Sequence, residues 1–414
     1  MRKTINLKNA LIIVTSFLMY FCLNNQSWAT ECFVLAWILL LMLRNISDLK
    51  QISLLALISG YFLFGYITLN SGYLRTDFNS PIRYVTKYMI LFFVFTISRI
   101  CIYLSSKEKK IFIKAAFISI IISCIVSIWY TIFVNSEAIR YREGIGITNT
   151  VSFDQAYGIS IFIPLYIYYI WKNWRKLKFR PIYVLIIGVF VFFLYKSQLV
   201  TAMILSLVGL FLFYFIEVVL NKKNKMLRLM GASFVFLLIY FLIRIYLVDF
   251  LFNFAALMPN TVRMRIQFVI DTFFFTQHAN SYNLGRRMEI ANYSWNSFKA
   301  HPFFGVGLSG IKYGSIGYHQ EWVDMLGVVG IVGTAVISVV VLRYVFRQYK
   351  LCTNTFDKNC YIVAILLFLI LGFFDPCLTD PVLFTVFAIA PNLSAMAWSK
   401  SESHNNIMEK KSYA

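Results

Sequence analysis

Arg286, Arg287, His319 and Glu321 are the residues of this chain whose types and spacing best suit chemistry. A guanidinium is a planar fork of N–H donors, so paired arginines suit the binding of phosphate or carboxylate oxygens. One residue separates His319 from Glu321, and a neighbouring carboxylate can orient a histidine ring as a base. The pattern predicts a reaction in which an anionic group leaves while a base removes a proton. The alternatives are arginines that pair with local acids or lipid headgroups, and a histidine with a structural role only.

Membrane-spanning helices must position these residues. Hydrophobic residues make up 59% of the 414 residues and charged residues only 14%, against about 25% charged residues in soluble domains. Mean hydropathy is +0.70. An ordinary soluble enzyme is therefore excluded. A spanning helix needs roughly 20 apolar residues, and twelve candidates are 10–24, 29–43, 52–69, 84–104, 111–134, 155–171, 181–195, 199–219, 231–251, 322–342, 360–374 and 382–398.

The apolar run 181–219 is interrupted by Lys196, Ser197 and Gln198. A single helix over this range would overshoot any bilayer, because a helix rises 1.5 Å per residue. The interruption therefore predicts two spans joined by a tight turn.

The basic residues indicate the orientation of the chain. With the N-terminus inside, the predicted cytoplasmic segments, which include 172–180 and 343–359, hold 24 of the 39 Lys and Arg residues, and the outer segments hold 11. Short inner loops rich in Lys and Arg follow the positive-inside rule. We therefore expect both termini to be cytoplasmic. The net charge of +21 reflects this topology and not a nucleic-acid partner.

The longest outer segment is residues 252–321, between the ninth and tenth predicted spans. It is too long to be a simple connector, and its aromatic residues predict short helices packed on the membrane face. We expect residues 1–414 to form one integral membrane domain, with the active-site motif in this loop. The seven cysteines include no CxxC pair, and the chain has no evident metal-binding cluster, so we expect neither a metal nor a cofactor.

Arginine and lysine divide unequally between the two faces. The inner segments hold 17 Lys and 7 Arg, whereas the outer segments hold 8 Arg and 3 Lys. Topology needs only charge, so outer arginines favour recognition of an anionic group. Because nucleoside triphosphates are cytoplasmic, an outward-facing enzyme needs a donor that arrives activated and membrane-bound, as a polyprenyl diphosphate-linked sugar does. The outer arginines are Arg75, Arg83, Arg140, Arg142, Arg263, Arg265, Arg286 and Arg287.

A dense motif ends the long loop and resembles that of the O-antigen ligase and polymerase (Wzy-type) superfamily of bacterial surface polysaccharide enzymes. That superfamily combines an arginine-containing start, a Pro-aromatic-x-Gly core, a histidine at the loop end and a Gly-φ-φ-Gly helix start, where φ is an apolar residue. Here these elements read Gly285-Arg286-Arg287-Met288-Glu289, His301-Pro302-Phe303-Phe304-Gly305-Val306-Gly307, Tyr318-His319-Gln320-Glu321-Trp322 and Gly327-Val328-Val329-Gly330. The motif covers about 50 residues, and the topology resembles the family's over the whole chain.

The resemblance assigns roles within this loop. The family's loop arginine falls on Arg287, fifteen positions before Pro302, with Arg286 as a neighbour that could substitute. The family's catalytic histidine falls on His319, followed by Gln320 in place of the usual asparagine.

Two further anion contacts are implied elsewhere. An Arg-Gly-Asn element matches Arg142, Gly144 and Asn149. A Ser-Arg element matches only in part, since Gln198 stands where the arginine would be and Lys196 is the nearby charge. We therefore expect Arg142, Arg286, Lys196 and Glu321 to bind pyrophosphate or glycan, and His319 and Arg287 to be catalytic.

The resemblance implies an all-α polytopic membrane protein (GT-C-like) in the bacterial cytoplasmic (inner) membrane, active on its periplasmic face. The activity implied is that of a metal-independent polymerase, which transfers glycan from an undecaprenyl diphosphate-linked oligosaccharide to another lipid-linked repeat unit. A ligase that uses lipid A-core as acceptor stays open, and a lipid-linked oligosaccharide flippase is a third alternative. Partners implied are membrane lipid, a chain-length regulator and a flippase, with no nucleic acid.

Overall fold

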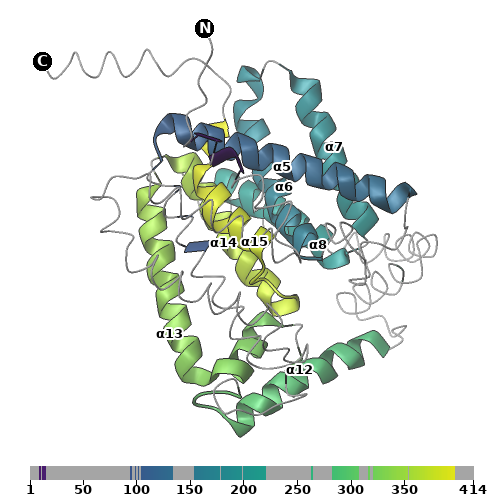
Figure 1. Cartoon of the computed structure of the whole chain (residues 1–414), viewed down its shortest axis with the longest axis vertical. Helices are drawn as coiled ribbons and strands as arrows, with labels where there is room; N and C mark the ends of the chain where they lie inside the picture. The colour runs from purple at the N-terminus through teal and green to yellow at the C-terminus, as the bar shows by residue number, and fades with distance from the viewer. Residues whose placement is uncertain are drawn as a thin grey trace, which may run out of the picture.

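The computed structural model describes residues 9–10, 12–14, 94–95, 98, 101, 104–133, 153–177, 179–197, 199–220, 263, 282–306, 316–317, 320–352 and 354–396. Every regular element in these ranges is a helix, as the sequence predicted (Figure 1). The elements are α5 (Ser106–Phe133), α6 (Phe153–Asn173), η2 (Trp174–Lys176), α7 (Arg180–Ser197), α8 (Val200–Tyr214), η3 (Phe215–Leu220), α12 (Tyr282–Ala300), α13 (Glu321–Leu351), α14 (Thr355–Phe374), α15 (Asp380–Phe384), η5 (Thr385–Ile389) and η6 (Ala390–Met396).

Four of these helices, α5, α7, α13 and α14, are long and apolar enough to cross a membrane. The chain is therefore a helical membrane protein. The tight turn predicted at 196–198 is confirmed, because α7 ends at Ser197 and α8 begins at Val200. The predicted spans 29–43, 52–69 and 231–251, with most of 10–24 and 84–104, lie outside the described residues. The total of twelve spans thus stays a prediction.

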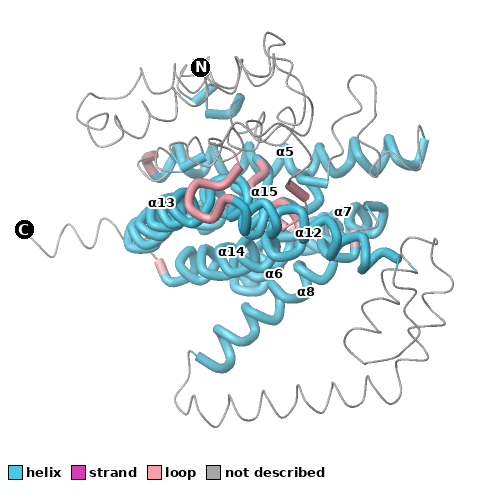
Figure 2. Tube along the Cα trace, turned by 90° about the horizontal axis from the view of Figure 1, so that it is seen from below, coloured by secondary structure: helices cyan, strands magenta, loops and turns pink. Residues whose placement is uncertain are grey.

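Helix α6 forms the centre of the described bundle. Its residues 155–166 are all buried, and it packs against α7, α8 and α15. The tube view shows α6 beside α8 and α14 (Figure 2). Aromatic rings join α6 to its other neighbours, since Tyr166 packs 5.1 Å from Phe117 of α5 and 5.7 Å from Phe190 of α7, measured between ring centroids. Such aromatic pairs add about 0.5–1.5 kcal/mol each beyond the area that they bury.

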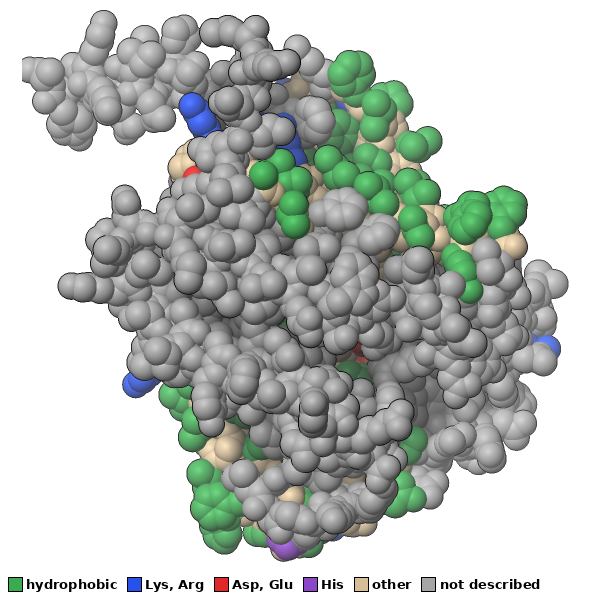
Figure 3. All heavy atoms as spheres, viewed as in Figure 1, with side chains coloured by type: hydrophobic (Ala, Val, Ile, Leu, Met, Phe, Trp, Pro, Cys, Tyr) green, Lys and Arg blue, Asp and Glu red, His purple; other side chains and the backbone are tan. Residues whose placement is uncertain are grey.

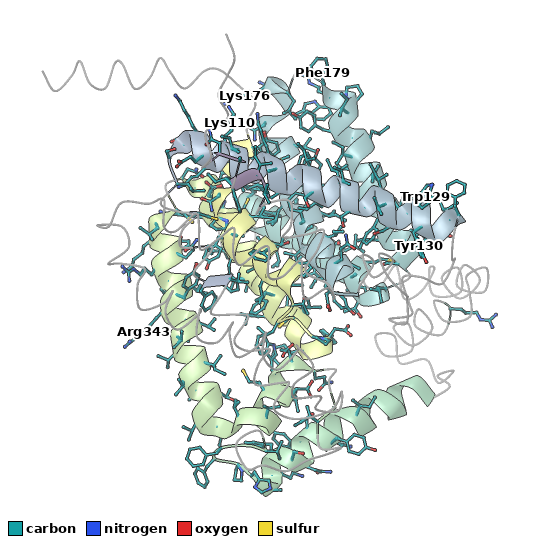
Figure 4. The ribbon with its side chains drawn as sticks, in the orientation of Figure 1. Lys110, Trp129, Tyr130, Lys176, Phe179 and Arg343 are labelled. Atoms are coloured by element: carbon teal, nitrogen blue, oxygen red, sulfur yellow. The ribbon has the colours of Figure 1, made fainter. Side chains whose placement is uncertain are left out.

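Basic side chains gather at one end of the described helices, whereas exposed aromatic side chains lie at both ends. Lys110 near the start of α5 and Lys176 after α6 lie at one end, whereas Trp129 and Tyr130 lie at the far end of α5 (Figure 4). Lys172 forms an ion pair of 2.7 Å with Glu217. That Lys110 and Lys176 face the cytoplasm stays a prediction of the positive-inside rule.

The predicted limits of the tenth span are wrong. Helix α13 contains a break at Gly330, where the backbone is non-helical, and then continues to Leu351. Its second segment, 331–351, is about 30 Å long at 1.5 Å per residue, which is enough to cross the bilayer core. Most of the predicted inner connection 343–359 is consequently helical, and only 352–354 joins α13 to α14. Long basic side chains permit this extension, because Arg343 points away from α13 and can reach the headgroups (Figure 4).

Candidate functional site

The turn formed by residues 301–306 docks into the break of α13. In an unbroken helix the amide of Ile331 would donate to the carbonyl of Gly327. Instead Ile331 N donates to Pro302 O at 2.8 Å, and Val306 N donates to the freed Gly327 carbonyl at 2.9 Å. Val332 N likewise donates to Phe303 O at 3.1 Å. The two Gly-containing motifs of the sequence therefore exchange backbone hydrogen bonds, and we call this contact the turn–helix lock.

Two glycines make the turn–helix lock possible. Gly305 has φ 66° and Gly330 has φ 65°, a region that other L-residues rarely adopt. Space is also lacking for a side chain at either position. A Cβ on Gly305 would lie 2.3 Å from the carbonyl oxygen of Val328, and a Cβ on Gly330 would lie 2.4 Å from the carbonyl of Phe303. The two glycines thus let the 301–306 turn and the break of α13 approach each other closely, backbone to backbone.

Asp324 joins three segments at this end of the molecule. Its carboxylate is fully buried and accepts a hydrogen bond from the hydroxyl of Ser294 on α12. The other carboxylate oxygen accepts from the amide of Gln320 at 3.2 Å, and Ser294 Oγ in turn accepts from the amide of Gly317 at 2.8 Å. A carboxylate in the first turn of a helix is further stabilised by the helix dipole. The Asp324 network therefore ties α12, residues 316–320 and α13 together.

Glu321 joins the start of α13 to the helical bundle. Its buried carboxylate accepts hydrogen bonds from the amides of Cys377 at 3.1 Å and Leu378 at 3.3 Å, in the connection between α14 and α15. Beside it, Trp322 Nε1 donates to the carbonyl of Leu369 at 2.9 Å, and its ring packs edge-on against Phe368. The start of α13 is consequently fixed against α14 by both polar and apolar contacts.

Helix α12 lies within the predicted loop 252–321 and packs against the first segment of α13, where Ser294 meets Asp324 (Figure 1). It buries Ser294 and Ser297, three residues apart, and exposes Trp295 and Lys299. Lys299 Nζ lies 5.9 Å from the centroid of the Trp295 ring. The helix is thus held by small polar residues on one side and presents aromatic and basic groups elsewhere.

The predicted site residues divide into three groups. Arg286 and Arg287 belong to α12, near its start, and the structure describes their backbone but not their side chains. His319 and Arg142 are themselves outside the described residues. Glu321 and Lys196 are described, Glu321 at the start of α13, close in sequence to Asp324, and Lys196 in the last turn of α7.

The chain on both sides of His319 is anchored. Gly317 is held by Ser294 and Gln320 by Asp324, so only Tyr318 and His319 separate two fixed points. Lys196 lies at the end of α7, where its Nζ is 5.7 Å from the ring centroid of Phe192 on the same helix. The described contacts of Lys196 thus do not bring it to α12 or α13.

Ser294 and Asp324 were missed by the sequence analysis. A signal was present for Asp324, because it falls inside the predicted span 322–342, where an ionisable residue is costly unless it faces protein or water. Ser294 offered no comparable signal, since a serine in a polar helix is common.

Comparison with known proteins agrees with the motif. A family model described as O-antigen ligase matches residues 184–338. The matched range includes α8, α12, the turn–helix lock and the Asp324 network. A search of curated proteins gave no match.

Substitution of Gly330 tests the turn–helix lock. We expect Gly330→Ala to lower the free energy of unfolding by about 1–3 kcal/mol, because alanine at this position can keep the positive φ only with backbone strain. Gly188→Ala is the matched control, since a Cβ on Gly188 meets nothing within 4 Å. The measurement is thermal unfolding in detergent, followed by size-exclusion chromatography. Equal melting temperatures for the two variants would contradict the lock.

A double-mutant cycle tests the Asp324 network. We expect Ser294→Ala and Asp324→Asn each to destabilise the protein by about 1–3 kcal/mol, as for buried hydrogen bonds to charged groups. The double variant should lose less than the sum of the two, because both changes remove one shared contact. Asn296→Ala, on an exposed position of α12, is the control. Strict additivity in reversible unfolding experiments would mean that the two residues act independently.

Proposed function

From the match to a family model described as O-antigen ligase, we propose that the chain is a surface polysaccharide polymerase of the O-antigen ligase and polymerase superfamily. In this proposal the donor is a glycan on undecaprenyl diphosphate, and the acceptor is a sugar hydroxyl of another lipid-linked repeat unit. The reaction takes place on the outer face of the cytoplasmic membrane. The family match over residues 184–338 carries the glycan-transfer part of the proposal, and the Asp324 network supports its site, because it ties α12 to Gly317 and Gln320 on either side of His319.

The chemistry divides between α12 and the segment before α13. Arg287, with Arg286, binds the pyrophosphate and neutralises the charge that develops as it leaves. His319 accepts the proton of the acceptor hydroxyl. The hydroxyl oxygen forms a bond to the anomeric carbon while the bond from that carbon to the pyrophosphate oxygen breaks, so one displacement inverts the anomeric configuration. Arg142 and Lys196 are proposed as additional pyrophosphate contacts.

The contacts of Glu321 favour a positioning role over direct contact with the glycan. Its carboxylate is fully buried and faces the amides of Cys377 and Leu378. A carboxylate that accepts two backbone N–H groups is held in one orientation. Glu321 therefore holds the start of α13, two residues after His319, against the end of α14.

A ligase is the second candidate function, because the matching family model is described as O-antigen ligase. A ligase would use the same donor and the same proton transfer, with lipid A-core as the acceptor. The two activities thus differ in the acceptor that the outer surface admits, and not in the residues that handle pyrophosphate.

Substitution of the two proposed catalytic residues tests the site. We expect His319→Ala and Arg287→Ala to abolish polysaccharide laddering on gels while the amount of membrane-inserted protein stays normal. Lys299→Ala removes an exposed positive charge from the same helix and should leave the ladder unchanged. Normal ladders from both site variants would refute the assignment.

Deletion of the gene separates the candidate activities by the glycan that remains. A polymerase predicts loss of the ladder with a single repeat unit still attached to its acceptor. A ligase predicts loss of all core-attached glycan, with lipid-linked polymer accumulating in the membrane. Accumulation of lipid-linked repeat units on the cytoplasmic side would instead identify a flippase.

A further inference from the structure

Two phenylalanines at the tip of the 301–306 turn are exposed although the turn itself is packed. Phe303 is 66% exposed and Phe304 is 60% exposed, whereas Val306 is only 2% exposed. Large apolar side chains in a fixed turn ordinarily pack inward, because exposure of their surface to water is unfavourable. The pair therefore indicates an apolar environment outside the protein.

The backbone around the tip is held in place. His301 O accepts from Gly305 N at 2.9 Å, which closes the turn, and Phe303 O accepts from Val332 N at 3.1 Å. The turn–helix lock thus fixes the backbone from which the two rings project.

The exposed tip continues an apolar stripe on α13. Ile331 and Val332, which bond to the turn, are 51% and 42% exposed. Exposed apolar residues then recur at intervals of three or four positions along the second segment of α13, the spacing of one helix face. They are Val336, Val339, Leu342 and Phe346. Hydrophobic side chains are visible at the lower end of α13 in the space-filling view (Figure 3).

We propose that Phe303 and Phe304 insert into the acyl chains of the outer leaflet and anchor the junction of α12 and α13 to the bilayer. Continuity with the stripe on α13 supports this partner, since that stripe belongs to a helix long enough to span the membrane. Phenylalanine has no polar tip and therefore suits the hydrocarbon region, while tyrosine and tryptophan suit the interface. Tyr293 and Trp295, exposed on α12, are residues of the second kind.

The anchor would set the depth of α12. Because α12 runs transverse to the direction of the second segment of α13 (Figure 1), it would run along the membrane surface when that segment spans the bilayer. The helix that carries Arg286 and Arg287 would then lie at the level of lipid headgroups. The anchor does not depend on whether the chain transfers glycans.

Depth measurements with spin labels test the anchor. Phe303→Cys, Phe304→Cys and Asn296→Cys are each labelled in the full-length chain and placed in phosphatidylethanolamine–phosphatidylglycerol nanodiscs. The unsubstituted protein, treated identically, gives the background from native thiols, and all five described cysteines are buried. The collision rate of each label is measured with oxygen, which concentrates in the bilayer, and with a water-soluble nickel chelate.

We expect the labels at 303 and 304 to collide more often with oxygen than with the chelate, and the label at 296 to show the reverse. Two positions are used so that a local disturbance at one cannot decide the result. A preference for the chelate at both tip positions would overturn the proposal. So would labels that are immobile and inaccessible to both reagents, because that outcome indicates a protein partner or a second copy of the chain.

Discussion

Hydrogen bonds from a separate turn replace the helical pairing that α13 loses at Gly330, and the rest of this end of the molecule depends on that exchange. Backbone amides without partners are costly in a membrane-embedded protein, because the hydrocarbon offers no water to replace them. The carbonyls of Pro302 and Phe303 supply acceptors where the helix cannot. The amides of Ile331 and Val332 thereby keep hydrogen-bond acceptors. The break at Gly330 lets the first segment of α13 point in a different direction from the second.

The first segment of α13 carries two buried carboxylates that bind different parts of the chain. Asp324 faces α12 and the chain that precedes α13, whereas Glu321 faces the connection between α14 and α15. One short helical segment therefore links the loop that carries the proposed chemistry to the membrane bundle. Such a link matters for catalysis because groups that stabilise developing charge must be held in position before the reaction begins.

The sequence predicted those features that depend on local composition. The turn after Ser197 was predicted because polar residues interrupt an apolar run, and the helical character of the loop because aromatic residues recur in it. The break of α13 was not predicted, because Gly330 lies among valines and hydropathy treats that run as a continuous span. The burial of Asp324 was missed for a related reason, since it depends on a serine thirty positions earlier in another helix. Both features arise from contacts between distant segments, which composition and spacing do not record.

Hydrogen exchange tests most directly whether the 301–306 turn holds the break of α13 together. The measurement compares amide exchange by mass spectrometry across peptides covering residues 327–333, in the parent protein and in Gly305→Ala, both in lipid nanodiscs. We expect faster exchange in this segment of α13 when the turn is altered, because the amides of Ile331 and Val332 lose their acceptors. Unchanged exchange across 327–333 in Gly305→Ala would contradict it.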